Sequence, residues 1–115
     1  MAITVQDLAD GVTHVIISGR IDIAGAAEID LPMSVVGGSR RSVIIDLSGV
    51  EFMASLGLRS IVLSGKSILS KRGKVALLAP QPTVEEVITI SGIDELISIY
   101  HDMETAIAAV SIASA

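Results

Sequence analysis

The sequence predicts an α/β fold, with a mostly parallel central sheet of about five strands, an antiparallel opening hairpin and about four helices. Strand-like segments alternate with helix-like segments, as expected for right-handed crossovers between parallel strands. Two continuous apolar runs, 43–47 and 75–79, have the pattern of strands buried on both faces. The chain has 115 residues, and we expect residues 1–115 to form a single domain.

The first two strands are expected to form the hairpin. Residues 3–8 and 12–18 alternate apolar and polar side chains or run apolar, and Ala9-Asp10-Gly11 between them is a turn signal. The next segment, 24–36, has the apolar content of a helix but carries Pro32 in its interior. We therefore expect a short or kinked helix that ends at Gly37-Gly38.

The strand at 43–47 is followed by a helix-like pattern. Apolar residues between 58 and 72 recur three or four positions apart, and basic residues occupy the polar side of this segment or its end. Gly73 closes this amphipathic helix. The strand at 75–79 then follows.

The last third of the chain predicts two helices and a short strand. Thr83 is a candidate N-cap for a helix that continues to Ile90, and Gly92 ends it. A short strand follows at 96–100. Asp102 is a candidate N-cap for the final helix, which extends to Ser114 and is expected to pack on the sheet.

Composition excludes several kinds of function. The chain has no cysteine, which excludes thiolate catalysis and cysteine-based zinc sites and suits a reducing cytosol. Its 13 acidic and 8 basic residues give a net charge of −5, which argues against a nucleic-acid binder. No apolar run approaches the roughly 18 residues of a membrane span, and the start lacks a signal-peptide pattern. We expect a cytoplasmic protein that does not insert into a membrane.

Few residues of the sequence lie in the patterns of known catalytic motifs. His14 and His101 lie far apart and belong to no metal-binding motif, so we interpret both as incidental. A nucleophile elbow around Ser55 would need glycine at the position of Met53. The glycines form neither a phosphate-binding loop nor a dinucleotide fingerprint. The sequence therefore predicts neither catalytic activity nor a cofactor.

The most informative segment is 43–58, in which an apolar run stops at a polar corner and a helix-like pattern begins. It places Ser55 at the helix start, where its hydroxyl can accept from free backbone N–H groups as a cap worth roughly 1 kcal/mol. A phosphate esterified to that hydroxyl would lie at the positive end of the helix macrodipole. Ser55 is thus either a structural cap or the site of a charge switch.

Four segments, taken in order, resemble the STAS domain of bacterial anti-sigma factor antagonists. They are Ser-Gly-Arg-Ile-Asp at 18–22, the strand-like run at 43–50, the corner at 52–58 and Gly-Lys-Val-Ala-Leu-Leu at 73–78. The resemblance covers nearly the whole chain from Ile3 to the last helix, and it implies a STAS-like fold.

The resemblance also implies a function and its partners. In that family, a serine at the helix start after the third strand is phosphorylated by an anti-sigma factor that is also a serine kinase, and a PP2C-like phosphatase reverses this step. The unphosphorylated antagonist captures the kinase and frees the sigma factor. The matching residue is Ser55, and the resemblance places partner binding at Asp22, Ala54, Ser55, Leu56, Gly57 and Arg59.

The corner departs from the family pattern, which is commonly Asp-Ser-Ser/Thr-Gly, because this chain has Ala54-Ser55-Leu56-Gly57. Alanine at position 54 removes a repulsion of roughly 1 kcal/mol between an aspartate and a phosphate about 6 Å away. The change bears on which kinase recognises the corner.

Several residues near the corner also have structural interpretations. Asp22 either helps to present Ser55 or forms a turn or cap. Gly57 is expected to permit close helix packing. Asp46 is interpreted as bonding nearby backbone at a strand end, and Ser48 as a turn residue.

Other function classes also fit the sequence. One is a STAS accessory subunit of a membrane transport ATPase, and another is a STAS scaffold that does not switch. A third, a binder of a small ligand or nucleotide, rests only on the general tendency of open α/β sheets to bind ligands at strand ends.

Overall fold

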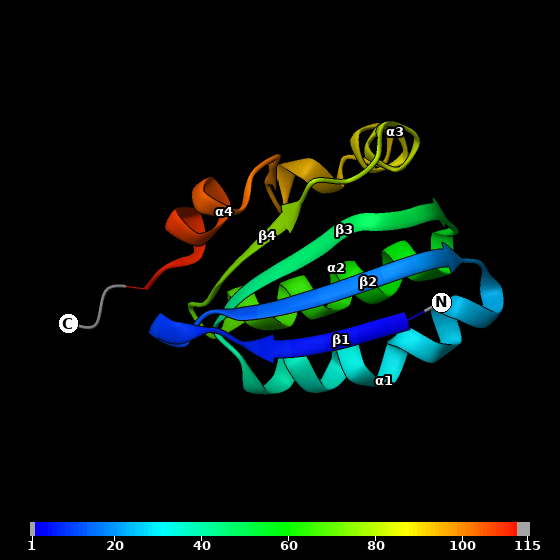
Figure 1. Cartoon of the computed structure of the whole chain (residues 1–115). Coiled ribbons are helices and arrows are strands. Elements are labelled where there is room, and N and C mark those ends of the chain that lie inside the picture. The colour runs from blue at the N-terminus through cyan, green and yellow to red at the C-terminus, as the bar shows by residue number, and fades with distance from the viewer. Residues whose placement is uncertain (1, 113–115) are drawn as a thin grey trace.

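The computed structural model describes residues 2–112, which form a five-stranded sheet in the order β1-β2-β3-β4-β5 (Figure 1). β1 is antiparallel to β2, and each later strand is parallel to its neighbour. The predicted mostly parallel sheet with an antiparallel opening hairpin is confirmed. The strands are β1 (Ala2–Asp7), β2 (Thr13–Ile21), β3 (Ser42–Met53), β4 (Lys74–Leu78) and β5 (Ile99–Tyr100), and the helices are α1 (Ile23–Ser39), α2 (Ser55–Ser70), α3 (Pro82–Ile90) and α4 (Met103–Val110).

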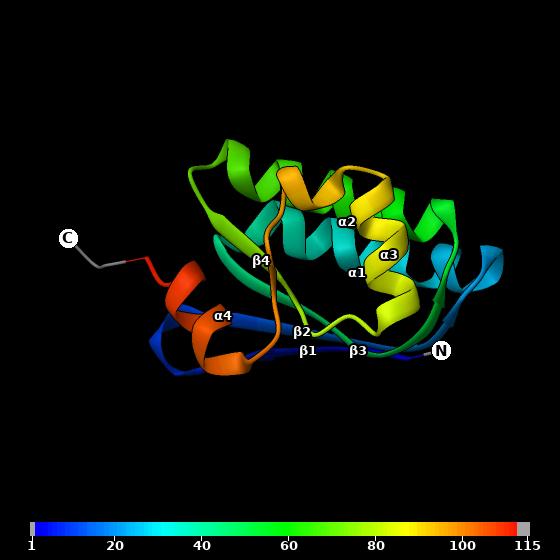
Figure 2. The ribbon, with the colours of Figure 1, turned by 90° about the horizontal axis from the view of Figure 1, so that it is seen from above.

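The helices cover the two faces of the sheet unequally. α1, α2 and α3 lie on one side, and α4 lies on the other (Figure 2). The larger core joins α1, α2 and α3 to residues such as Val15 and Ile45 of the sheet. The smaller core joins Ala106 and Val110 of α4 to the opposite face, including Ile44. The final helix therefore packs on the sheet, as predicted.

α1 is longer than the sequence predicts. It continues through Pro32 and through Gly37-Gly38 to Ser39, and the N–H of Arg40 closes it on the carbonyl of Val36 at 2.9 Å. The expected short helix ending at Gly37-Gly38 is wrong. Buried apolar side chains hold α1 against the core, although Pro32 has no backbone N–H to donate within the helix. Tertiary packing overrides the local helix-breaking signals.

β3 is also longer than predicted, because it continues past Leu47 to Met53. Ser48, expected in a turn, lies inside the strand at a shift of register: Ile16 pairs with Asp46, but Ser18 pairs with Gly49. The Asp46 carboxylate accepts hydrogen bonds from the backbone N–H of Ser48 at 3.0 Å and from its hydroxyl at 2.7 Å. The polar residues that follow the apolar run therefore form a bulge stabilised by a side chain. Asp46 bonds nearby backbone, as expected, but it lies inside β3 and not at a strand end.

The last third follows the predicted order with altered boundaries. Thr83 does not cap α3, because the helix already begins at Pro82, a residue suited to the first helical position. Gly92 ends this region in the left-handed conformation with φ of 77°. The short strand starts only at Ile99, since a 3-10 turn, Ile93–Glu95, lies before it.

The Asp102 carboxylate caps α4 by accepting from the Thr105 N–H at 2.8 Å, as predicted. The helix ends at Val110, short of the predicted end, and the predicted extension over 113–114 lies outside the described residues.

Candidate partner-binding site

Two helices begin at the carboxyl ends of the neighbouring strands β2 and β3. Ile21 pairs with Met53 at the end of this parallel ladder, and the backbone N–H of Ala54 donates to the carbonyl of Ile21 at 2.8 Å. The chain then enters α1 through Asp22 and α2 through Ala54. Both helix N-termini therefore lie at the edge of the sheet where α/β folds commonly place their functional sites.

Asp22 is the N-cap of α1. Its carboxylate accepts a hydrogen bond from the Gly25 N–H at 2.9 Å, and its backbone is extended. The structural interpretation of Asp22 as a cap is confirmed. The backbone bond between Ile21 and Ala54 is what links the start of α1 to the start of α2.

Ser55 is exposed and is the first residue of α2. The N-cap is Ala54, and no side chain caps this helix, so the prediction that the Ser55 hydroxyl acts as the cap is wrong. The N-cap lies at residue 54 and not at residue 55, because the Ile21 carbonyl accepts a hydrogen bond from the Ala54 N–H and holds residue 54 in an extended conformation. The Ser55 hydroxyl is left at the surface, free of a capping role.

Gly57 is buried between the ends of β2 and β3. A Cβ at this position would lie 2.6 Å from Cγ2 of Ile21 and 2.6 Å from Sδ of Met53. These distances are far below van der Waals contact. Gly57 therefore lets α2 approach the strands closely, as predicted.

The flanks of α2 next to Ser55 carry apolar grooves. Ile23 is 73% exposed and Leu56 47%, and both line a groove of about 440 Å³ between α1 and α2. Ser55 borders a second groove of about 410 Å³ on the other flank, toward Ile93. The exposed side chain of Arg59 lines both grooves. The structure thus gathers Asp22, Ala54, Ser55, Leu56, Gly57 and Arg59 around one corner, with Gly57 beneath its surface.

Ile23 belongs to this surface but was not predicted as a site residue. Arg20 and Phe52, one position before the buried Ile21 and Met53, point to the opposite face of the sheet. Ile23 is exposed next to the Asp22 cap, and the Arg20 guanidinium lies 4.7 Å from the centroid of the exposed Phe52 ring. Such a cation–π contact is worth about 0.5–1 kcal/mol and orients both side chains. Phe52 is one of only two aromatic residues in the chain and is the first residue of the corner segment 52–58.

The two histidines lie away from this corner. His14 Nε2 is 2.9 Å from a carboxylate oxygen of Asp46, and His101 Nε2 is 2.8 Å from one of Glu85. Among residues 2–112, no group of three or more His, Cys, Asp and Glu side chains could hold a metal ion. Within the same residues, no helix has both the length and the apolar character needed to cross a bilayer.

Comparison with known proteins gives a consistent result. Residues 5–106 match the STAS domain family. The anti-sigma-F factor antagonist RsfB of Mycobacterium tuberculosis is 31% identical over 111 residues, which cover 93% of this chain and 89% of that protein.

Solved structures agree with the sequence comparison. An anti-sigma factor antagonist from Mycobacterium paratuberculosis has a TM-score of 0.84 and 30% identity, covering 95% of this chain and 92% of that one. The Bacillus cell fate determinant SpoIIAA, in its phosphorylated form, has a TM-score of 0.72 at 21% identity, covering 93% and 97%, and shares the fold.

Proposed function

This chain belongs to the STAS domain family, and we propose that it is an anti-sigma factor antagonist whose binding to an anti-sigma factor is switched by phosphorylation of Ser55. The observation that carries the proposal is the exposed, uncapped Ser55 at the first position of α2, beside exposed apolar side chains. The names of the relatives support it, because RsfB and the Mycobacterium paratuberculosis protein are both called antagonists of anti-sigma factors.

In the unphosphorylated state, the partner docks on the corner formed by the starts of α1 and α2. Exposed apolar side chains of Ile23 and Leu56 supply contact area, and the exposed Arg59 supplies a positive charge beside them. Asp30 lines the same groove, and its carboxylate accepts a hydrogen bond from the Ser60 hydroxyl at 2.9 Å. This combination suits a protein surface that presents apolar groups together with a carboxylate. The proposed partner is an anti-sigma factor with serine kinase activity, which therefore docks next to its own substrate hydroxyl.

Phosphorylation changes the charge of this surface without disturbing the fold. A phosphoserine adds about −1.5 to −2 charges and three acceptor oxygens. At the first position of α2 the phosphate faces the positive end of the helix, which favours it by about 0.3–1 kcal/mol. SpoIIAA has been solved in a phosphorylated form with the same overall fold.

Phosphorylation of Ser55 does, in contrast, weaken the complex with the anti-sigma factor. Burying a phosphate in the interface without a cationic group on the partner costs several kcal/mol, which is on the order of a hundredfold or more in affinity. The phosphorylated antagonist is therefore released, and a PP2C-like phosphatase returns it to the binding state.

Ala54 modifies how the kinase recognises the corner. The Ala54 side chain is partly exposed and carries no charge, so the kinase meets an apolar rather than an acidic neighbour of the substrate serine. Leu56, on the other side of Ser55, extends the same apolar surface. We therefore assign this chain to a kinase whose docking surface is apolar at both positions.

The test is a binding titration with the anti-sigma factor, using wild type, Ser55→Ala and Ser55→Glu. We expect Ser55→Ala to bind like wild type and Ser55→Glu to bind at least about tenfold more weakly. Ser70→Glu is the matched control, because Ser70 is exposed on the same helix about 22 Å away. Incubation with the kinase and ATP, followed by mass spectrometry, should locate a single phosphate on Ser55. Unmodified Ser55 together with full binding by Ser55→Glu would refute the proposal.

A further inference from the structure

The two edges of the sheet differ in how well they are protected. β5 has only two residues, Ile99 and Tyr100, and short edge strands offer little to a pairing chain. β1 has six residues, contains neither proline nor lysine, and carries its only charge at Asp7, its last residue. Natural proteins usually block such an edge with charges, proline or a bulge. β1 is therefore open to pairing with another strand.

The backbone groups available at this edge follow from the pairing of β1 with β2. The N–H of Leu8 donates to the carbonyl of Val12 at 2.7 Å, and these residues continue the antiparallel register in which Asp7 pairs with Thr13. In an antiparallel ladder, hydrogen-bonded pairs alternate with non-bonded pairs. The N–H and C=O groups of Ile3, Val5 and Asp7 therefore face outward, away from β2.

An uncharged apolar strip accompanies this edge. Leu31 and Val35 of α1 are 73% and 59% exposed, and together with Val5 they line a groove of about 510 Å³ between α1 and β1. The partly buried Ile3, in the same strand, packs against the main core. The strip therefore combines free backbone groups with side chains that gain free energy on burial.

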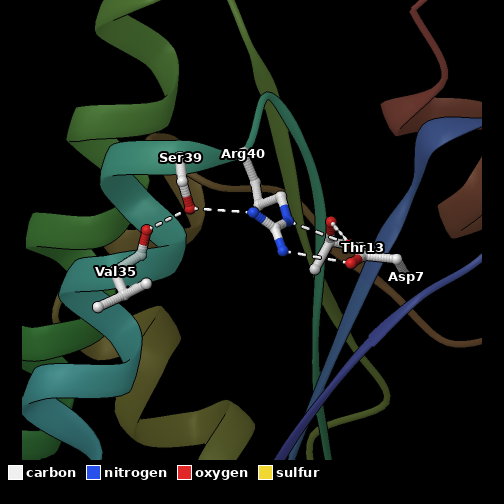
Figure 3. A network of polar contacts seen from close by, with 5 residues as sticks. All are labelled: Asp7, Thr13, Val35, Ser39 and Arg40. Atoms are coloured by element: carbon white, nitrogen blue, oxygen red, sulfur yellow. Dashed lines mark hydrogen bonds and ion pairs between the residues drawn. The ribbon is translucent and has the colours of Figure 1, made fainter.

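The charged end of the strip is neutralised within the molecule. The Arg40 guanidinium donates to both carboxylate oxygens of Asp7, at 3.1 and 3.2 Å, and also to the Ser39 hydroxyl (Figure 3). Thr13 donates to the same carboxylate at 2.8 Å. This network ties the end of α1 to the end of β1, so the strand is held in place before any partner arrives.

We propose that a second copy of this chain pairs with β1 across a two-fold axis and joins the two sheets into one of ten strands. A register with Thr4 opposite Thr4 places Ile3 of each copy opposite Val5 of the other. Both of these residues present outward backbone groups, so the two pairs form four hydrogen bonds and bring apolar side chains together. Centring the axis on Val5 instead would put the Asp7 carboxylate opposite the apolar Ile3.

The charge distribution favours a second copy over a charged partner. Each chain has a net charge of −5, so two copies repel each other over most of their surfaces. The strip formed by residues 2–6 and 31–36 contains no charged residue, which lets identical copies approach there. A strongly charged peptide would find no counter-charge on this strip. The proposal is independent of the switch at Ser55.

Engineered disulfides test the register directly, because the chain has no native cysteine. In the proposed dimer, Thr4 faces its own copy in a non-hydrogen-bonded pair with Cα atoms about 4.5 Å apart, which suits a disulfide. The two Gln6 residues lie four positions apart along the strands, about 13 Å, which is too far. We expect Thr4→Cys to form a covalent dimer under mild oxidation and Gln6→Cys to remain monomeric. Equal cross-linking of both variants, or cross-linking by Val5→Cys instead of Thr4→Cys, would overturn the proposal.

The second measurement is the mass of the unmodified chain in solution by sedimentation or light scattering. We expect a concentration-dependent dimer, and Leu31→Glu should raise its dissociation constant about tenfold or more. Ile90→Glu is the matched control, because Ile90 is 78% exposed on α3, away from β1. A monomer at every concentration, with no Thr4→Cys disulfide, would refute the pairing and leave the edge to some other chain.

Discussion

Replacing Gly57 with alanine tests how the fold presents Ser55. The new methyl group would lie 2.6 Å from both Ile21 Cγ2 and Met53 Sδ, so the neighbours have to retreat by about 1 Å to reach normal contact. Overpacking of this kind costs about 1–3 kcal/mol, whereas alanine in a helix gains up to about 1 kcal/mol over glycine. Because Ile21 is β-branched and fully buried, we expect the cost to dominate, with a net loss of about 1–2 kcal/mol.

The assay is urea unfolding followed by circular dichroism, with thermal unfolding as a second measure. The expected loss corresponds to a fall in Tm of about 4–8 °C. Gly38→Ala is the matched control, because Gly38 also lies in a helix but its Cβ would meet no atom within 4 Å. That variant should be slightly more stable than wild type. If Gly57→Ala were stabilised to the same degree as Gly38→Ala, the packing argument would be wrong.

Two further predictions concern carboxylates, one in β3 and one at the start of α1. Burial acts to raise the pKa of Asp46, but hydrogen bonds from the backbone N–H and hydroxyl of Ser48 and from His14 outweigh it, so the folded-state pKa is lowered. Asp46 therefore stabilises the fold above its unfolded pKa of about 4, and this contribution is lost as the pH falls through the pKa of the folded state. In urea unfolding, the difference in stability between wild type and Asp46→Asn should therefore shrink from pH 5 toward about pH 2. Asp22→Ala should cost about 1 kcal/mol through loss of the α1 cap, whereas Asp22→Asn should retain stability and partner binding. Weaker binding by a stable Asp22→Asn variant would show instead that the carboxylate contacts the partner.

The sequence predicts the order and pairing of the elements better than their ends. The order is carried by signals that do not depend on distant residues, such as the buried-strand pattern at 43–47 and the turn at 9–11. The ends of α1 and β3 depend on distant contacts. Pro32 and Gly37 are helix breakers in isolation, but the helix continues because its apolar face is buried. At Gly37 the two helices are so close that a Cβ there would lie 3.1 Å from Cα of Ser64 in α2. Local propensity contains no information about that contact.

The same distinction applies to the candidate site. The position of Ser55 near a helix start follows from the sequence pattern, but the helix starts one residue earlier than a serine N-cap would allow. The cause is the hydrogen bond from the Ala54 N–H to the carbonyl of Ile21, which lies 33 positions earlier in the chain. Exposure of Ile23 likewise depends on how β2 and β3 end together, so it could not be recognised as part of the surface from its sequence neighbours alone.

The one-residue shift at the start of α2 favours the proposed switch. A serine at the N-cap would hold its hydroxyl against backbone N–H groups, and a kinase would have to break that bond before transferring phosphate. With Ala54 at the cap, the Ser55 hydroxyl is already exposed, and the first turn of α2 has no side chain bound to its N–H groups. Those groups can instead accommodate a phosphate. Moving the cap back to position 54 with Ala54→Ser should therefore stabilise the fold by about 1 kcal/mol in urea unfolding. The same variant should slow phosphorylation of Ser55 by the kinase, because the new cap competes for those N–H groups; a rate equal to that of wild type would contradict this account.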